Sequence, residues 1–325
     1  METGETSPLK TIFVGGPGRS GTSFVAERLG RHAEVCSFPG VELKIFSEKN
    51  GLLDLRHALV ERYSPNRAGV ALDQFRKLFG ALVGGQFGQP AFGTLAPPSA
   101  WFNILDGFCD RISAHGIPVQ FEAVEFDDAV RTLLSRVASL AALIKESAAS
   151  PVAFLEKTPH ALLFVDFLAR FAPAPQFVHV MRDPRSIAFS LRRMPWGPRD
   201  LEGCCAWVSG YCAAWLDSQK KAAQTGCALH RINIEAVAAA PDHASRLICD
   251  RLGLSFDDAV FAEADLKTLN AWVEKCAEVE LLQIRRALDG WARHFGYDAA
   301  AIGFTEMPVP SSVPMFAEAV AEEIP

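Results

Sequence analysis

The stretch that decides the fold is Thr11-Ile-Phe-Val-Gly-Gly-Pro-Gly-Arg-Ser-Gly-Thr-Ser23. A short apolar run opens it, and the residues Gly15–Gly18 break that run. Beyond the break, the apolar residues Phe24, Val25 and Leu29 recur at helical spacing. A strand, a glycine turn and a helix in this order predict the first strand–helix unit of an α/β domain.

The turn itself has the spacing of a phosphate-binding loop. Gly16 and Gly21 match the two glycines of the pattern G-x-x-x-x-G-K-[ST], but Thr22 stands where the lysine belongs. That lysine bridges the β- and γ-phosphates of a triphosphate, so its absence disfavours triphosphate chemistry. A cation is present at Arg19 instead. Backbone N–H groups and a helix N-terminus are expected to bind an anion here. The predicted anion-binding residues are Gly18, Arg19, Ser20, Gly21, Thr22 and Ser23.

The same alternation recurs three times further along the chain. Apolar strands are predicted at 151–155, 176–181 and 228–234, followed by amphipathic segments at 159–171, 184–193 and 241–252. Three more helical segments are predicted at 127–149, 201–225 and 264–295. Strands that alternate with helices predict a three-layer α/β fold of the P-loop type, with a central, mainly parallel sheet flanked by helices.

Length and composition allow one large α/β domain or two smaller ones. The chain has 325 residues, of which 49% are hydrophobic and 22% charged, enough to bury a sizeable core. The stretch Gly84–Phe102 is rich in glycine, proline and aromatics. That stretch is expected to be irregular, either as a lid or binding loop or as an ordinary surface loop. The Pro- and Glu-rich tail 305–325 is expected to be mobile.

Charge and cysteine content exclude several classes of function. The net charge of −6 argues against general binding of nucleic acid or anionic membranes. No apolar run is long enough for a membrane span, and the N-terminus lacks the pattern of a secretory signal. The eight cysteines include no C-x-x-C pair, so neither a zinc site nor a disulfide framework is predicted. These features favour a cytoplasmic protein whose oligomeric state the sequence leaves open.

Two further strands end in cationic residues. Arg182 follows the strand 176–181, where open α/β sheets bind ligands, and Ser190 lies two helical turns later. The two could share a phosphate, although an Arg-Asp-Pro turn alone is more often a helix start. Lys157 follows the strand 151–155, where it either extends its charge to water or faces a ligand.

Together these motifs resemble sulfotransferases that use 3′-phosphoadenosine 5′-phosphosulfate (PAPS). G-R-S-G-T-S is similar to the family's 5′-phosphosulfate loop, and R-D-P-R-S-I-A-F-S is similar to its 3′-phosphate motif, with Arg182 and Ser190 at the family's separation. E-K-T-P matches the bacterial subgroup, and Lys157 stands where tyrosylprotein sulfotransferases carry a catalytic lysine. N-I-E-A-V from Asn233 and F-G-Y-D ending at Asp298 extend the resemblance over about residues 10–300, which implies one sulfotransferase domain over 10–304. Residues 50–126 match weakly, and the resemblance implies that this region is variable and contacts the acceptor.

The resemblance implies transfer of the sulfuryl group from PAPS to a hydroxyl or amine by in-line displacement, without a metal. Arg19, Thr22 and Lys157 are then expected to stabilise the charge that develops in the transition state. Two candidates remain for the base: Glu42 and His160, with Glu42 preferred.

Two alternatives and one open question remain. A P-loop kinase or NTPase would need ATP and Mg²⁺, and a non-catalytic nucleotide-binding protein would show a damaged base or lysine. The acceptor, whether a small molecule, a glycan or a peptide, is not identified. Trp101 and the segment 192–196 could contact it, and a structural role is equally open for both.

Overall fold

The computed structural model of this chain describes residues 9–114, 116–145, 150–258, 260–262, 269 and 271–297. The tail 305–325, predicted to be mobile, and Asp298 lie outside the described residues. The chain divides into two compact units. Unit 1 comprises Met1–Phe13 and Leu29–Gln176, and unit 2 comprises Val14–Arg28 and Phe177–Pro325.

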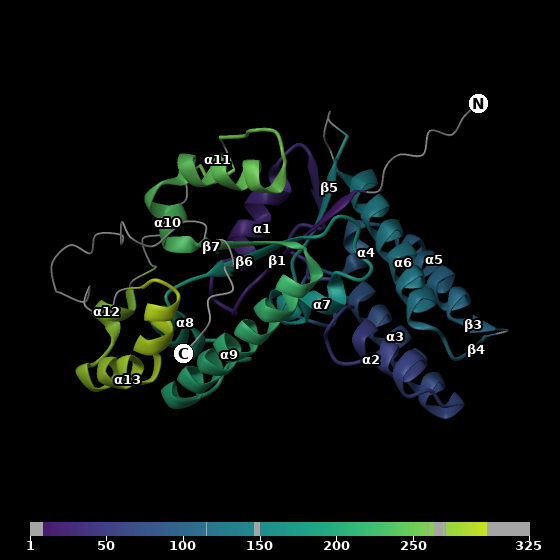
Figure 1. Cartoon of the computed structure of the whole chain (residues 1–325), viewed down its shortest axis with the longest axis horizontal. Helices are drawn as coiled ribbons and strands as arrows, with labels where there is room; N and C mark the ends of the chain where they lie inside the picture. Colours follow the sequence, from purple (N-terminus) through teal and green to yellow (C-terminus); the bar gives the residue numbers. More distant parts are fainter. Residues whose placement is uncertain are drawn as a thin grey trace. The chain divides into compact units, whose positions relative to one another are not determined.

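Among the described residues, five strands form a central sheet in the order β2-β5-β1-β6-β7 (Figure 1). Their bounds are Lys10–Gly15 (β1), Val35–Ser37 (β2), Ala153–Glu156 (β5), Gln176–Met181 (β6) and Ala228–Asn233 (β7). Strands β1 and β2 both pair in parallel with β5, where Lys10 and Val35 lie opposite Ala153. β1, β5 and β6 are almost wholly buried, as in parallel sheets covered on both faces. The predicted α/β class with a parallel central sheet flanked by helices is confirmed.

Several predicted elements have the bounds that the sequence indicated. The strand β6, the helix α9 (Leu201–Thr225) and the helix α11 (Pro241–Leu252) agree with the prediction residue for residue. Helix α1 (Thr22–Arg31) begins directly after the glycine turn, as expected. α9 and α11 both end at a glycine in the left-handed conformation, Gly226 and Gly253. A glycine directly after each helix is a strong local signal, which explains why the predicted ends of α9 and α11 are accurate.

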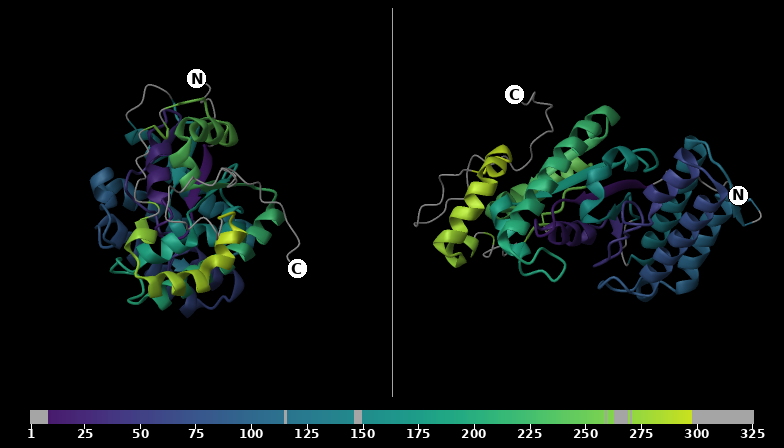
Figure 2. Two further views of the ribbon diagram at one scale, coloured as in Figure 1. Left: turned by 90° about the vertical axis from the view of Figure 1, so that its left-hand side faces the viewer. Right: turned by 90° about the horizontal axis from the view of Figure 1, so that it is seen from below.

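Unit 1 contains a group of helices, most of them from the region 50–126 that is predicted to be variable. The elements are α2 (Leu52–Arg56), a π-helical turn (His57–Glu61), α3 (Pro65–Val83), α4 (Phe92–Leu95), α5 (Pro98–Arg111), the hairpin β3 (Ser113–Ala114) and β4 (Ile117–Pro118), and α6 (Ala123–Ile144). Figures 1 and 2 show α3, α5 and α6 side by side. Ser64 caps α3, and a capping box of Glu122 and Glu125 starts α6.

Two segments of unit 1 differ from the sequence prediction. The stretch 84–102, expected to be irregular, contains α4 and the start of α5, because Phe92 and Trp101 bury their rings against each other. The stretch 159–171, expected to be one amphipathic helix, forms a 3₁₀ helix (Pro159–Phe164) and the short helix α7 (Val165–Leu168). Its apolar side chains are buried on more than one side, so the single-face pattern does not apply.

Unit 2 adds α8 (Pro184–Leu191), α10 (Ile234–Ala239), α12 (Ala271–Lys275) and α13 (Glu278–His294). Helices α8, α9 and α13 pack against one another. Asp183 caps α8 by accepting from the Arg185 N–H, and Asp200 caps α9 by accepting from the Gly203 N–H. The Asp183 cap, which directly follows Arg182, determines where α8 starts.

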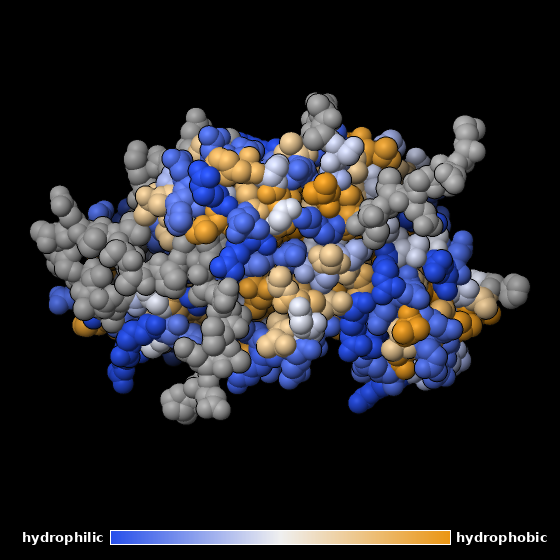
Figure 3. All heavy atoms as spheres, turned by 45° about the horizontal axis from the view of Figure 1, so that its top comes forward, coloured by the Kyte–Doolittle hydropathy of each residue, from blue (hydrophilic) through white to orange (hydrophobic). Residues whose placement is uncertain are grey.

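On the face shown in Figure 3, hydrophobic areas are interrupted by hydrophilic ones. No helix within the described ranges combines the length and the hydropathy that crossing a membrane would require.

Candidate active site

The phosphate loop of unit 2 lies between β1 and α1, and its shape depends on glycine at two positions. Gly16 has φ +154° and Gly21 has φ +100°, values that residues with a Cβ atom rarely adopt. A Cβ atom at Gly16 would lie 2.2 Å from the carbonyl oxygen of Val180. Glycine therefore allows the loop to pass directly against β6.

Polar groups of this loop are arranged as an anion site. Ser20 and Thr22 are buried, with exposures of 0% and 4%, whereas Arg19 and Ser23 are exposed. In the part of the chain that the structure describes, Ser20 Oγ has no hydrogen-bond partner. α1 starts at Thr22, so its N-terminus and the positive end of its dipole lie at the loop. A buried hydroxyl without a partner beside a helix N-terminus fits an anionic group.

Arg182 and Ser190, predicted to share a ligand, both lie at this loop. Arg19 Nε donates to Ser190 Oγ over 3.2 Å, and Arg182 Nη1 donates to the Arg19 carbonyl oxygen over 3.4 Å. Arg182 Nη2 also donates to the carbonyl oxygen of Leu269. Burial lowers the pKa of Arg182 below its ordinary value, yet a guanidinium stays charged at neutral pH. The arrangement concentrates two guanidinium groups and a hydroxyl around the loop.

A buried network supports the residue that follows Arg182. Glu235 Oε1 accepts a hydrogen bond from the Asp183 N–H at 2.9 Å, and the Tyr297 hydroxyl donates to Glu235 Oε2 at 2.9 Å. Burial raises the pKa of Glu235 from 4.5 to about 7. Asp183 in turn forms a salt bridge with Arg185, whose other end contacts Asp289 at 3.0 Å. The backbone beside Arg182 is thus held by side chains of unit 2.

In unit 1, the preferred base and the predicted catalytic lysine form an ion pair. Lys157 Nζ donates to Glu42 Oε1 over 2.6 Å, and Lys44 Nζ lies 3.4 Å from Glu42 Oε2. The side-chain exposures are 11% for Lys157 and 22% for Glu42, so both can be reached from solvent. A carboxylate and an ammonium group at this distance offer a proton acceptor and a positive charge in one place.

His160, the second candidate base, lies in the same unit. It is the second residue of the 3₁₀ helix and is half-buried. Burial lowers its pKa below the ordinary value of 6.5, while the nearby carboxylates of Glu48 and Glu42 act in the opposite direction. The charge of Glu42 therefore acts on His160, but it is Glu42 that forms the ion pair with Lys157.

Sequence reasoning selected Lys157 but not the residues on either side of it. Glu156 is 2% exposed and accepts from the Leu43 N–H at 3.2 Å, and Thr158 Oγ1 accepts from the Lys44 N–H at 3.2 Å. Burial raises the pKa of Glu156 from 4.5 to about 7, and hydrogen bonds from Thr158 and Leu43 oppose this rise. The sequence signal that could have identified Glu156 is an acidic residue at the end of an otherwise apolar strand.

The two tryptophan sites suggested for an acceptor have different surroundings. Trp101 is fully buried in α5, and its indole N–H donates to the Phe92 carbonyl oxygen over 2.9 Å. Trp196 is 58% exposed, and a Cβ atom at Gly18 would lie 2.8 Å from its Cη2 atom. Trp101 therefore stabilises the core of unit 1, and Trp196 lies against the phosphate loop of unit 2.

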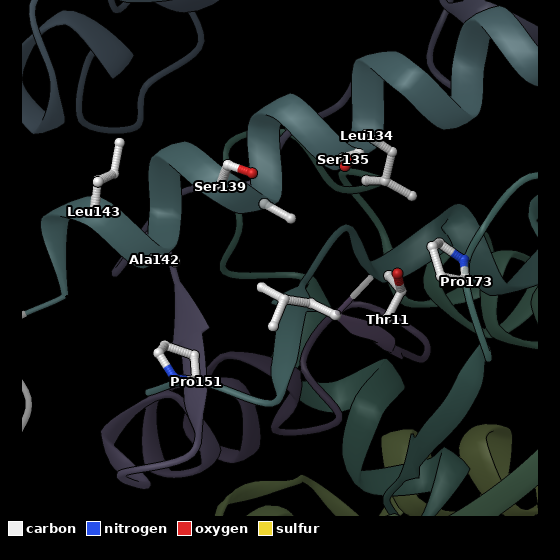
Figure 4. A pocket seen from close by; sticks show the side chains of 10 residues that line it. Thr11, Leu134, Ser135, Ser139, Ala142, Leu143, Pro151 and Pro173 are labelled. Atoms are coloured by element: carbon white, nitrogen blue, oxygen red, sulfur yellow. The ribbon is translucent and has the colours of Figure 1, made fainter. Parts of the chain in front are cut away.

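A pocket of about 440 Å³ in unit 1 contains none of the predicted site residues (Figure 4). Helix α6 lines one side with Leu134 and Leu143, and Thr11 and Pro151 lie on the other side. Thr11 is near the start of β1 and Pro151 precedes β5, so the pocket lies at the amino ends of these strands. Ligand sites of parallel sheets lie at the carboxyl ends, where Lys157 follows β5.

The last groups to consider are metal-ligating side chains and thiols. Over the described ranges, no group of three or more His, Cys, Asp or Glu side chains is arranged to hold a metal ion. All eight cysteines are free thiols, and six of them are buried.

Comparisons with known proteins identify the family. A sequence model of the sulfotransferase family matches residues 11–258, and the chain therefore belongs to this family. It is accordingly a sulfotransferase, an enzyme that transfers sulfuryl groups, and the kinase or NTPase alternative is not favoured. No curated protein sequence gives a significant match.

Solved structures with similarity to this chain include three bacterial proteins or domains. The sulfotransferase domain of the olefin synthase of Synechococcus PCC 7002 has 16% identity and a TM-score of 0.47, over 90% of this chain and 95% of that one. The sulfotransferase domain of the curacin biosynthetic pathway has 13% identity and a TM-score of 0.47, over 90% and 98%. The sulfotransferase STF1 of Mycobacterium tuberculosis H37Rv has 13% identity and a TM-score of 0.43, over 87% and 77%.

Proposed function

We propose that this sulfotransferase uses PAPS as donor and transfers its sulfuryl group to an acceptor hydroxyl or amine, with adenosine 3′,5′-bisphosphate as the second product. The observation that carries the proposal is the cluster of Arg19, Arg182 and Ser190 around a phosphate loop that lacks its lysine. Each guanidinium group can bind a phosphate or sulfate group through two N–H donors, so two of them can serve a ligand that carries two anionic groups.

The residues of unit 2 are compatible with the donor. The loop residues Gly18–Ser23 would bind the 5′-phosphosulfate, because Ser20 Oγ is buried without a partner and the glycines keep the loop clear of side chains. Arg182 and Ser190 would bind the 3′-phosphate. When bound, PAPS supplies an activated sulfuryl group, and the reaction needs no metal from the protein.

The charged residues identified from the sequence would perform the chemistry. The acceptor oxygen attacks sulfur, the bond from sulfur to the bridging oxygen of the donor breaks, and the acceptor proton passes to Glu42. Lys157 and Arg19 would stabilise the negative charge that develops on the leaving oxygen and the sulfuryl oxygens. His160 is the alternative base. We propose that residues 10–304 act as one catalytic domain in the cytoplasm, and that residues 50–126 determine the acceptor.

Ligand-dependent stability tests the donor assignment. PAPS at a hundredfold excess over its Kd should stabilise the protein by about 2.7 kcal/mol, observed as a rise in Tm. ATP with Mg²⁺ and adenosine 5′-phosphate serve as controls and should give a smaller rise. Incubation with radiolabelled PAPS and a panel of sugars, phenols, tyrosine peptides and lipids then detects the product. Stabilisation by ATP with Mg²⁺ alone, or no labelled product with any acceptor, would contradict the proposal.

A further inference from the structure

The segment 42–44 of unit 1 is held by side chains rather than by secondary structure. Its three main-chain N–H groups donate, in chain order, to Gln89 Oε1 at 3.0 Å, Glu156 Oε1 at 3.2 Å and Thr158 Oγ1 at 3.2 Å. Gln89 Nε2 also donates to the carbonyl oxygen of Glu42 at 2.9 Å. Three consecutive main-chain donors thus each have a dedicated side-chain acceptor.

The number of protons that each group carries determines which group donates and which accepts. The Thr158 hydroxyl accepts from the main chain of 42–44, so its single proton is available to donate to Glu156 Oε1, 2.5 Å away. The Thr158 N–H donates to Glu156 Oε2 at 3.1 Å. Glu156 therefore receives three hydrogen bonds, two at Oε1 and one at Oε2.

Lys157 lies between these two residues in sequence and contacts the same segment through its side chain. Its Nζ donates to Glu42 Oε1, whereas Glu156 and Thr158 bind the main chain of the next two residues. Three consecutive residues at the end of β5, 156–158, thus bind the three consecutive residues of the 42–44 segment. This explains why the motif at this strand end is Glu-Lys-Thr rather than an isolated lysine.

Magnitudes indicate which of these contacts determines the position of Glu42. A part-exposed ion pair such as Glu42–Lys157 contributes little to stability, because water screens it. Buried hydrogen bonds contribute more, because a buried donor or acceptor that loses its partner is left without water as well. The buried bonds of Glu156 and Thr158 therefore outweigh the ion pair in holding the segment.

We propose that Glu156 and Thr158 are positioning residues that hold the main chain of residues 42–44 and so keep Glu42 in contact with Lys157. The catalytic value of this positioning rests on the proposed function, in which Glu42 is the base. A misplacement of about 1 Å in such a group can cost roughly 10²-fold in rate. Neither residue needs to touch the donor or the acceptor.

Thr158→Val tests the proposal, because valine preserves the shape and removes the hydroxyl. We expect kcat to fall by roughly 10- to 100-fold, with acceptor KM and the Kd for adenosine 3′,5′-bisphosphate within about twofold of wild type. Thr158→Ser keeps the hydroxyl and should retain kcat. Thr132→Val is the matched control, since the Thr132 hydroxyl donates to the Asp128 carbonyl oxygen in α6. Hydrogen exchange of a peptide covering 42–44 should be faster in Thr158→Val than in the other proteins.

A second variant keeps the test decisive if Thr158→Val does not fold. Glu156→Gln retains the shape, but its amide has only one acceptor oxygen, so it cannot accept hydrogen bonds on both sides as Glu156 does. It should therefore lower kcat and leave KM unchanged, as Thr158→Val does. Unchanged kcat in both folded variants, or unchanged exchange of 42–44, would overturn the proposal. An equal loss in Thr158→Ser would also overturn it.

The exchange measurement separates this proposal from the proposed function. If wild-type protein transfers no sulfuryl group from PAPS, the proposed function fails and the catalytic role of the positioning fails with it. Faster exchange in Thr158→Val would still show that the hydroxyl holds 42–44. If wild type is active and exchange does not change, only the positioning inference is wrong.

Discussion

The ion pair of unit 1 and the arginine cluster of unit 2 have opposite charge arrangements. Glu42 lies against two ammonium groups, those of Lys157 and Lys44, so its negative charge is compensated within the site. Arg19 instead donates to the Ser190 hydroxyl, and Arg182 donates to the carbonyl oxygens of Arg19 and Leu269. The first arrangement suits proton transfer, and the second suits the binding of an anion.

The two regions share one structural device. In each, a glutamate buried at the edge of the sheet accepts from the main-chain N–H next to a proposed site residue: Glu156 beside Glu42, and Glu235 beside Arg182. Burial raises the pKa of both glutamates from 4.5 to about 7. The functional side chains of the two regions therefore differ, but in both a buried glutamate holds the neighbouring backbone.

Glu42→Gln should produce the largest effect, because it removes the proton acceptor and preserves size. We expect kcat to fall by roughly 10²–10⁴-fold, with the Kd for adenosine 3′,5′-bisphosphate unchanged because unit 2 is intact. Steady-state kinetics with labelled PAPS and a binding titration measure both quantities. Substantial activity in this variant, together with an inactive but folded His160→Ala, would assign the base to His160.

Lys157→Ala should reduce turnover more than nucleotide binding, since its charge is needed most when the leaving oxygen becomes negative. The expected loss in kcat is roughly 10²–10³-fold. Lys44→Ala is the matched control, because Lys44 contacts the other oxygen of the same carboxylate. An equal loss in both variants would mean that the charge of the pair, rather than Lys157 itself, is what turnover requires.

Arg182→Ala should act on binding rather than on turnover. Loss of a charge-assisted contact should weaken adenosine 3′,5′-bisphosphate by about 1.5–3 kcal/mol, or about 10- to 150-fold. Adenosine 5′-phosphate, which lacks the 3′-phosphate, should be affected far less. Arg192→Ala, which breaks a surface pair with Glu280, is the control. Equal weakening of both nucleotides would contradict the assignment of the 3′-phosphate to Arg182.

The smallest expected effect is a pH dependence of stability shared by both glutamates. Because the folded pKa is raised, each folded-state glutamate keeps a proton between about pH 4.5 and pH 7 that the unfolded chain releases. This contribution to stability is present below pH 4.5 and is lost as pH rises to about 7. Glu156→Gln and Glu235→Gln lack it, so their stability deficit relative to wild type should shrink by on the order of 1 kcal/mol over that range.

Urea unfolding at pH 5 and pH 8 measures this effect. A deficit that grows with pH in either variant would show that this glutamate is ionised throughout, and that the two regions do not share the device.

Much of the fold could be predicted because its signals are local. The glycine turn after Val14, the proline at position 184 and the glycines at 226 and 253 mark the ends of elements within a few residues. The single helix expected over 159–171 was wrong, because burial on several sides cannot be recognised from a periodicity that assumes one buried face.

The predicted site residues were found through motifs, and their partners were not. Arg19 and Ser190 are 171 positions apart in the chain, and their contact follows only from the way unit 2 folds. Gln89 was placed in a loop of undefined role, although it holds the main chain of Glu42 from 47 positions away. Nothing in a glutamine within a Gly- and Pro-rich stretch indicates such a bond.

The sequence by itself determined the family, the α/β class, the phosphate loop and the identity of the charged residues at the strand ends. These properties depend on residue types and spacings within short segments, where backbone preferences and burial patterns operate. Only the tertiary structure decided that Glu42 pairs with Lys157 across 115 positions, and that Glu156 and Thr158 bind the main chain beside Glu42. The physical reason is that a hydrogen bond depends on distances of about 3 Å between atoms, and such distances between remote segments exist only once the chain has folded.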